Sequence, residues 1–113
     1  MRALLALCLT LALAAPALAA HTHGKYFLPS HGKRKVTVHR GKRAARKVIR
    51  RVYDVRPDTD IYACSRHAVD EVGCDFAFYS GAGEYTCGNA RVNANPRRIV
   101  VRYVADTGAC DDF

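Results

Sequence analysis

Four cysteines in the second half of the chain, Cys64, Cys74, Cys87 and Cys110, restrict the fold more than any other feature. The fifth cysteine, Cys8, lies in the predicted leader and would be removed with it. The even number that remains in a short exported chain is typical of a framework of two disulfides, each of which adds about 2–4 kcal/mol of stability. A zinc site fits the spacing less well, because no two of these residues form a Cys-x-x-Cys pair. Four cysteines allow three pairings. We favour Cys64–Cys74 with Cys87–Cys110, because Cys64 and Cys74 fall on adjacent predicted strands.

Residues 1–19 have the layout of a secretory signal peptide, with one positive charge, a short apolar run and small residues before the cleavage point. The apolar run is shorter than the roughly 20 residues that a membrane-spanning helix needs. Cleavage after Ala19 fits the preference for small residues best, and cleavage after Ala20 stays open. We therefore expect a secreted or periplasmic protein of about 93 residues, which is enough for one small domain.

Charge is distributed unevenly along the mature chain. Residues 21–56 contain twelve Lys or Arg and one acidic residue, whereas residues 57–113 contain five Lys or Arg and nine acidic residues. Residues 20–40 also contain several histidines, two glycines and a proline without sustained periodicity, which predicts a flexible basic arm. The disulfide-tied domain is expected to span residues 41–113.

A helix is predicted from about Gly41 to Asp54. Apolar side chains recur at helical spacing there, and cationic side chains fill the other side. Pro57 is expected to stop the helix. The apolar arc comprises Ala44, Ala45, Val48, Ile49, Val52 and Tyr53.

The rest of the chain predicts an antiparallel meander. In the run Cys74–Tyr79, Cys and Phe alternate with Asp, Ala and Tyr, which is typical of a half-buried strand. Ser80–Gly83 predicts a tight turn and Gly88 a bulge. We expect an α+β fold in which one amphipathic helix packs on a sheet of three to four strands. The predicted strands are about Ile61–Arg66, Val72–Tyr79, Glu84–Val92 and Arg98–Val104.

The cationic arm and helix face form the first candidate site. They could bind an anionic polymer, an envelope surface or nucleic acid through counterion release, although a solvated face that keeps a small domain soluble is an equally good interpretation. Insertion of the helix into a membrane is disfavoured, because its apolar side lacks Trp, Phe and Leu. The candidate anion-binding residues are Lys33, Arg34, Lys35, Lys42, Arg43, Arg46, Lys47, Arg50 and Arg51.

The amino terminus is a second candidate. Cleavage after Ala20 would begin the mature chain at His21-Thr22-His23. A free amine, two amides and the imidazole of His23 would then offer the square-planar nitrogen set that suits Cu(II) or Ni(II). Cleavage one residue earlier abolishes this geometry, and a tail that merely contains histidines is the simpler interpretation.

Catalysis is the weakest candidate. His67 lies near Arg66, Asp70 and Glu71 in the sequence, as an acid–base pair would require, but proximity within one loop does not establish a shared geometry. The sequence contains no motif of a serine hydrolase, a zinc protease or a phosphate-binding loop. We expect a binding protein rather than an enzyme, with a small secreted hydrolase or a domain like a protease inhibitor as lesser alternatives.

Overall fold

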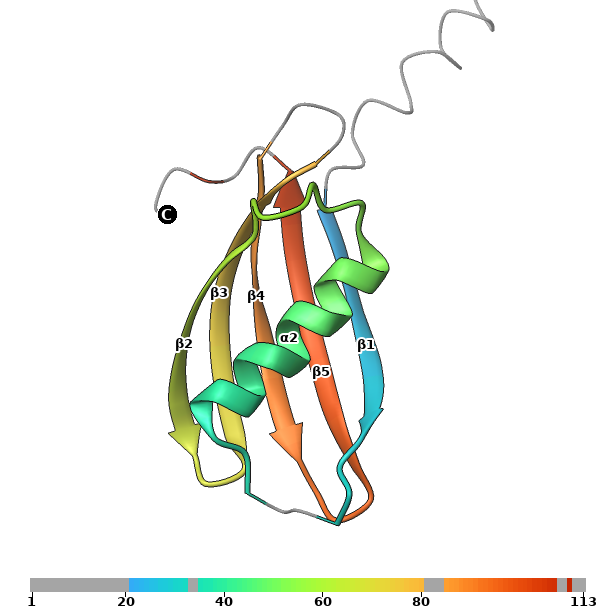
Figure 1. The fold of residues 1–113 in the computed structure, drawn as a ribbon, viewed down its shortest axis with the longest axis vertical. Coiled ribbons are helices and arrows are strands. Elements are labelled where there is room, and N and C mark those ends of the chain that lie inside the picture. The colour runs from blue at the N-terminus through green and yellow to red at the C-terminus, as the bar shows by residue number, and fades with distance from the viewer. Residues whose placement is uncertain (1–20, 33–34, 81–84, 108–109, 111–113) are drawn as a thin grey trace, which may run out of the picture.

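One helix packs on one face of a five-stranded antiparallel sheet (Figure 1). The computed structural model describes residues 21–32, 35–80, 85–107 and 110. The expected α+β class is confirmed, and the sheet has five strands instead of the three to four expected. The elements in chain order are β1 (His21–Pro29), α2 (Val38–Val52), β2 (Ile61–Ala68), β3 (Glu71–Tyr79), β4 (Tyr85–Ala94) and β5 (Arg98–Thr107).

The fifth strand is β1, which pairs with β5 at one edge of the sheet in the order β1-β5-β4-β3-β2. The interpretation of residues 20–40 as a flexible arm is therefore wrong for residues 21–29. Their alternation is hidden in the sequence, because the positions that face the helix include Thr22 and Gly24 as well as Tyr26 and Leu28. A side chain at Gly24 would overlap the ring of Tyr103, so this small residue is required by the packing.

Helix α2 begins three residues earlier than expected. Thr37 is its N-cap, and its Oγ1 accepts a hydrogen bond of 3.1 Å from the backbone N–H of Arg40. The helix ends at Val52, where the N–H of Tyr53 donates to the carbonyl of Ile49, so Pro57 is not the residue that stops it. Val52 is 40 % exposed and lies outside the core, contrary to its place in the predicted arc.

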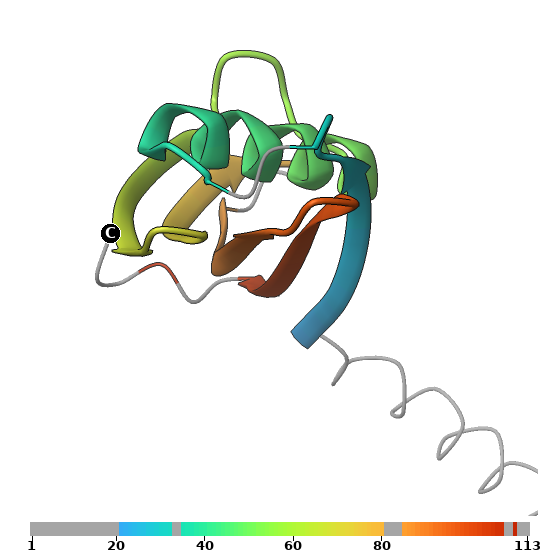
Figure 2. The same cartoon turned by 90° about the horizontal axis from the view of Figure 1, so that it is seen from below.

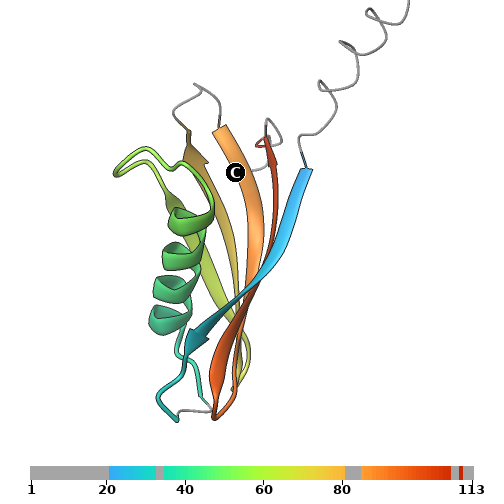
Figure 3. The ribbon, with the colours of Figure 1, turned by 90° about the vertical axis from the view of Figure 1, so that its right-hand side faces the viewer.

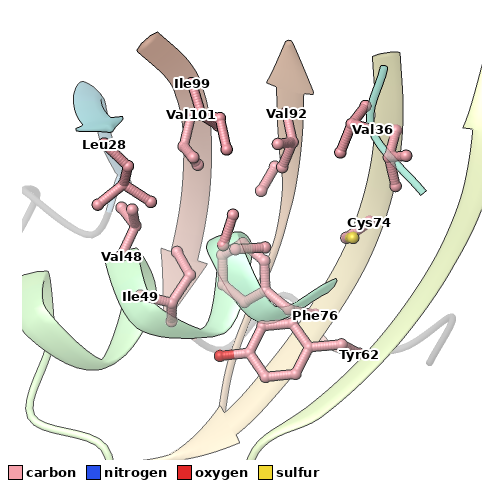
Figure 4. Packing of buried hydrophobic residues seen from close by; sticks show 14 of the residues in the cluster. Leu28, Val36, Val48, Ile49, Tyr62, Cys74, Phe76, Val92, Ile99 and Val101 are labelled. Atoms are coloured by element: carbon pink, nitrogen blue, oxygen red, sulfur yellow. The ribbon is translucent and has the colours of Figure 1, made fainter. Parts of the chain in front are cut away.

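The core lies between α2 and the sheet (Figure 4). Small side chains on the helix allow a close approach: a Cβ at Gly41 would lie 2.7 Å from the Cβ of Val72. Full burial of one Val, Ile or Phe side chain stabilises a fold by about 1.5–3 kcal/mol. The buried residues of α2 besides Gly41 are Ala44, Ala45, Val48 and Ile49, and those of the sheet include Leu28, Tyr62, Val72, Phe76, Phe78, Val92, Ile99 and Val101.

The sheet has two different faces. It curves around α2 when it is viewed end-on (Figure 2), and α2 lies on one side only (Figure 3). Because successive side chains of a strand point to opposite faces, every second residue points away from the helix. We call this second surface the outer face.

The predicted bulge at Gly88 is wrong. Gly88 pairs in regular register with Phe76 on one side and Ala105 on the other. Glycine is needed there because a side chain would overlap the backbone of Val104 and the ring of Phe76. The register shift lies instead between Arg66 and Ala68 in β2.

The predicted turn at residues 81–83 and the predicted signal peptide fall outside the described residues.

The two disulfides, Cys64–Cys74 and Cys87–Cys110, have the pairing that was favoured from the predicted strands. Cys64 and Cys74 lie directly opposite each other on β2 and β3, with their Cα atoms 4.0 Å apart. Cys87, on the outer face of β4, is joined to Cys110 with a Cα separation of 5.3 Å. Within the described residues, no helix has the length and apolar character needed to cross a membrane.

Candidate anion-binding site on helix α2

Helix α2 carries seven Arg or Lys residues and no acidic residue. Its buried residues recur at helical spacing, so the cations are confined to the side that points away from the sheet, which no strand covers (Figure 3). Arg50 and Arg51 lie in the last turn, where positive charge is favourable to the helix dipole. The other five cations of α2 lie outside the last turn and gain no such stabilisation from the helix dipole.

Five of these cations surround a shallow hollow on the exposed side of α2. Its volume is about 460 Å³, and it is open to solvent. Arg43 and Lys47 lie one turn apart, about 6 Å along the helix axis. We call this region the helix cation face. It is lined by Arg40, Arg43, Ala44, Arg46, Lys47 and Arg50.

Asp60 is the acidic residue that this surface contacts. Both carboxylate oxygens accept hydrogen bonds of 2.7 Å from Arg50, and Arg46 lies 3.8 Å away. The side chain of Asp60 is 2 % exposed, whereas that of Arg50 is 46 % exposed. The hydrogen bonds from Arg50 hold the pKa of the Asp60 carboxyl below its usual range, and the carboxylate raises the pKa of Arg50. Asp60 therefore stays ionised and neutralises one of the two arginines.

Three other cations of α2 are held by neighbouring groups. Arg46 lies over the ring of Tyr62, 5.2 Å from its centroid. Arg51 donates a hydrogen bond of 2.8 Å to the hydroxyl of Tyr26 and also lies over that ring. Arg40 donates to the backbone carbonyls of Ser30 and Lys35, so it ties the start of the helix to the preceding loop.

Lys42, Arg43 and Lys47 have no hydrogen bond or ion pair in the part of the chain that the structure describes. Arg43 and Lys47 are exposed, and Lys42 is partly buried. These two exposed side chains are thus the ones best placed to contact an anion from solvent. Their neighbours Arg40, Arg46 and Arg50 keep the surrounding surface positive without leaving their own contacts.

The structure brings together part of the predicted anion-binding set. Lys42, Arg43, Arg46, Lys47, Arg50 and Arg51 share α2, and Lys35 is exposed just before it. Lys33 and Arg34 lie outside the described residues. Arg40, which lines the hollow, was missed, because the helix was expected to begin only at Gly41. The N-cap signal of Thr37 could have revealed the additional turn.

The predicted metal ligands lie in β1. His21 is in register with Asp106, and His23 with Val104. In an extended strand successive amide nitrogens point in opposite directions, so the four nitrogens of the expected site do not converge in this conformation. Residues 21–23 would have to leave the strand to bind Cu(II) or Ni(II) in that way. No cluster of three or more His, Cys, Asp or Glu suitable for a metal occurs within the described ranges.

The predicted catalytic residues do not all lie on one face of the sheet. Arg66 is in register with the buried Val72 and donates to the carbonyls of Val36 and Val69. His67 lies on the outer face over Gly73, where a side chain would overlap its imidazole. Glu71 accepts a hydrogen bond of 3.3 Å from Asn93. The arrangement thus holds Arg66 and Glu71 in structural contacts.

Comparison of the chain with models of protein families, with curated proteins and with solved structures finds no match. The function is accordingly argued from the arrangement of the residues.

Proposed function

We propose that the protein is a non-enzymatic binding module whose helix cation face contacts an anionic polymer with closely spaced phosphate or sulfate groups. The observation that carries this proposal is that α2 has seven cations and no acid, with five of them around one hollow. Arg43 and Lys47 supply the direct contacts, and the held arginines supply the surrounding positive potential.

The cost of this arrangement to the helix supports a role in binding. Cations four residues apart are neighbours on a helix surface, and each such like-charge pair destabilises a helix by about 0.2–0.5 kcal/mol. Helix α2 has four of these pairs: Lys42 with Arg46, Arg43 with Lys47, Arg46 with Arg50, and Lys47 with Arg51. Alternating acidic and basic residues would keep such a face soluble at lower cost, so solubility alone does not account for the pattern.

The compartment is part of the proposal. Disulfides persist in oxidising compartments, and this small domain has two. Together with the predicted leader, they support a secreted or periplasmic protein. Polymers there that carry phosphate or sulfate groups offer the repeated negative charge that a row of cations recognises through counterion release.

The proposal is tested with the double variant R43Q/K47Q. Glutamine is a good helix former and removes only the charge, so the fold is retained. Binding to fluorescent polyphosphate and to heparin is measured by anisotropy at low salt. We expect the variant to bind at least about tenfold more weakly, because each lost contact with an anion accounts for at least about 0.7 kcal/mol. If the wild type binds polyphosphate more tightly than heparin, phosphate is the preferred anionic group. If it binds heparin more tightly, sulfate is preferred.

The matched control is R56Q/R97Q, which removes two exposed arginines outside α2. Its affinity should stay within about threefold of the wild-type value. Equal losses in the two double variants would mean that net charge alone governs binding, and the helix cation face would then be rejected as the site.

A further inference from the structure

A row of three cations crosses the outer face of the sheet, on the side opposite to α2. Lys25 of β1 lies opposite Arg102 of β5, which in turn lies opposite Arg91 of β4. Neighbouring strands are about 4.8 Å apart, so the row spans about 10 Å. The same register continues to Gly73 of β3 and Ser65 of β2, so one line crosses all five strands.

Within the described residues, no acidic side chain forms an ion pair with a cation of this row. Two carboxylates do lie nearby on the same face of β3, those of Glu71 and Asp75 on either side of Gly73. Arg91 and Arg102 are exposed, and neither has a hydrogen bond or ion pair among the residues that the structure describes. The positions next to Arg102 along β5 on the same face are Val100 and Val104. Like charges directly opposite each other destabilise a sheet. The fold therefore tolerates a repulsion here that a bound anion would relieve.

The row leads into a second hollow over β2, β3 and β4, with a volume of about 360 Å³. Gly73 and His67 both line it, and the imidazole of His67 lies over this glycine. Arg91 belongs both to the row and to the wall of the hollow, which also includes the amide of Asn89, the hydroxyl of Ser65 and the carboxylate of Asp75. Arg91, Asn89 and Ser65 can donate hydrogen bonds to phosphate or sulfate oxygens, whereas Asp75 can only accept them. An anion is therefore expected on the Arg91 side of the hollow.

At the β1 end, Arg98 lies 4.2 Å from the ring centroid of Phe27, and Lys25 lies 5.8 Å from it. Phe27 is 46 % exposed and is on the same outer face. The aromatic ring holds two cations at the sheet edge by cation–π contacts. The cationic surface thus extends from the edge strand to the hollow.

We propose that the outer face, through Lys25, Arg91 and Arg102, is a second binding site for the same anionic polymer, so that one protein molecule bridges two polymer chains. This inference rests on the proposed function, since the helix cation face binds the first chain. The two cationic surfaces are separated by the core and the sheet. A segment of polymer seated on one therefore leaves the other open to a second chain.

Bridging is measured by capture in two steps. Biotinylated short polyphosphate on a sensor surface is loaded with protein, and free fluorescent polyphosphate is then injected. The wild type should capture the second polymer. The variant R91Q/R102Q should load nearly as well but capture less than about a tenth as much. The control R56Q/R97Q removes the same charge elsewhere and should capture like the wild type.

The outcomes separate the two proposals. A wild type that loads but captures nothing, or an R91Q/R102Q variant that captures like the wild type, overturns the second site and leaves the helix site standing. A wild type that does not load overturns the proposed function itself. Melting provides a test without ligand: R91Q/R102Q should melt at a temperature at least as high as the wild type at low salt. A lower melting temperature would contradict the unrelieved repulsion on which the inference depends.

Discussion

Replacement of Asp60 by Asn should weaken the fold and at the same time strengthen polyanion binding. Asp60 is the buried acid that accepts both guanidinium hydrogen bonds of Arg50 and lies 3.8 Å from Arg46. Asn keeps the size of the side chain but removes its charge and one acceptor oxygen. The substitution therefore separates what Asp60 does for the helix from what it does to the charge of the binding surface.

The loss of stability can be estimated from the hydrogen bonds. A hydrogen bond to a charged group contributes about 1.5–3 kcal/mol, and Asn retains one neutral acceptor. Arg50 is 46 % exposed, so solvent screens part of the attraction. We expect the free energy of unfolding to fall by about 1.5–2 kcal/mol at pH 7. For a domain of this size, that loss lowers the melting temperature by roughly 6–16 °C.

The pH dependence follows from the lowered pKa of Asp60. A carboxyl whose pKa is lower in the folded state stabilises the fold fully above its unfolded pKa, about 3.9, and this contribution is lost as the pH falls through the folded pKa. The difference between wild type and D60N should therefore be constant above about pH 5. It should shrink as the pH falls below about 4.

The gain in affinity has an electrostatic origin. For an assumed separation of about 7 Å between Asp60 and a bound anion, removing the negative charge changes their interaction by roughly 0.6 kcal/mol in water, which gives about a threefold tighter complex. Urea unfolding by circular dichroism measures the stability, and anisotropy of fluorescent polyphosphate measures the affinity. The control D58N removes an exposed acid from the same turn, where φ is 61°, a conformation that Asn tolerates. Equal stability of D60N and D58N, or weaker polyphosphate binding by D60N than by the wild type, would refute the reasoning.

Three further substitutions test the fold by urea unfolding. C87S/C110S opens a loop with a sequence separation of 23 residues. The chain-entropy relation predicts that the free energy of unfolding falls by about 3.4 kcal/mol. A loss below about 1 kcal/mol would mean that this disulfide constrains the unfolded chain little. Thr37→Ala removes the N-cap acceptor of α2 and should cost about 1 kcal/mol, with Thr37→Ser as the control that should retain most of the stability. Gly41→Ala should destabilise by about 1–3 kcal/mol although Ala favours helices, because the new Cβ would lie 2.7 Å from Val72; an increase in stability would show that the helix is not packed this closely.

The meander β2–β5 could be predicted from the sequence because its strands alternate clearly. In β3, for example, Val72, Cys74, Phe76 and Phe78 occupy successive inward positions. The predicted strands also placed Cys64 and Cys74 on adjacent strands, which decided the favoured disulfide pairing, and the structure shows them directly opposite each other. The amphipathic pattern of α2 was visible for the same reason, since its small apolar residues recur on one side.

Strand β1 could not be predicted, because the packing against Tyr103 requires glycine at position 24 and leaves only Tyr26 and Leu28 as apolar inward residues. The cation row was missed as well. Its three members come from β1, β5 and β4, which are far apart in the sequence, and only the pairing register aligns them. The sequence shows each of these cations, but it does not show that they lie side by side across neighbouring strands.

The salt dependence of polyphosphate affinity tests the central claim most directly, because it counts the cations that contact the polymer. The logarithm of the association constant should fall linearly with the logarithm of the salt concentration, with a slope of about 0.7 for each contact on a single strand. For R43Q/K47Q the slope should be smaller by about 1.4 than for the wild type. A slope that is the same in both proteins would contradict the claim that Arg43 and Lys47 bind the polymer.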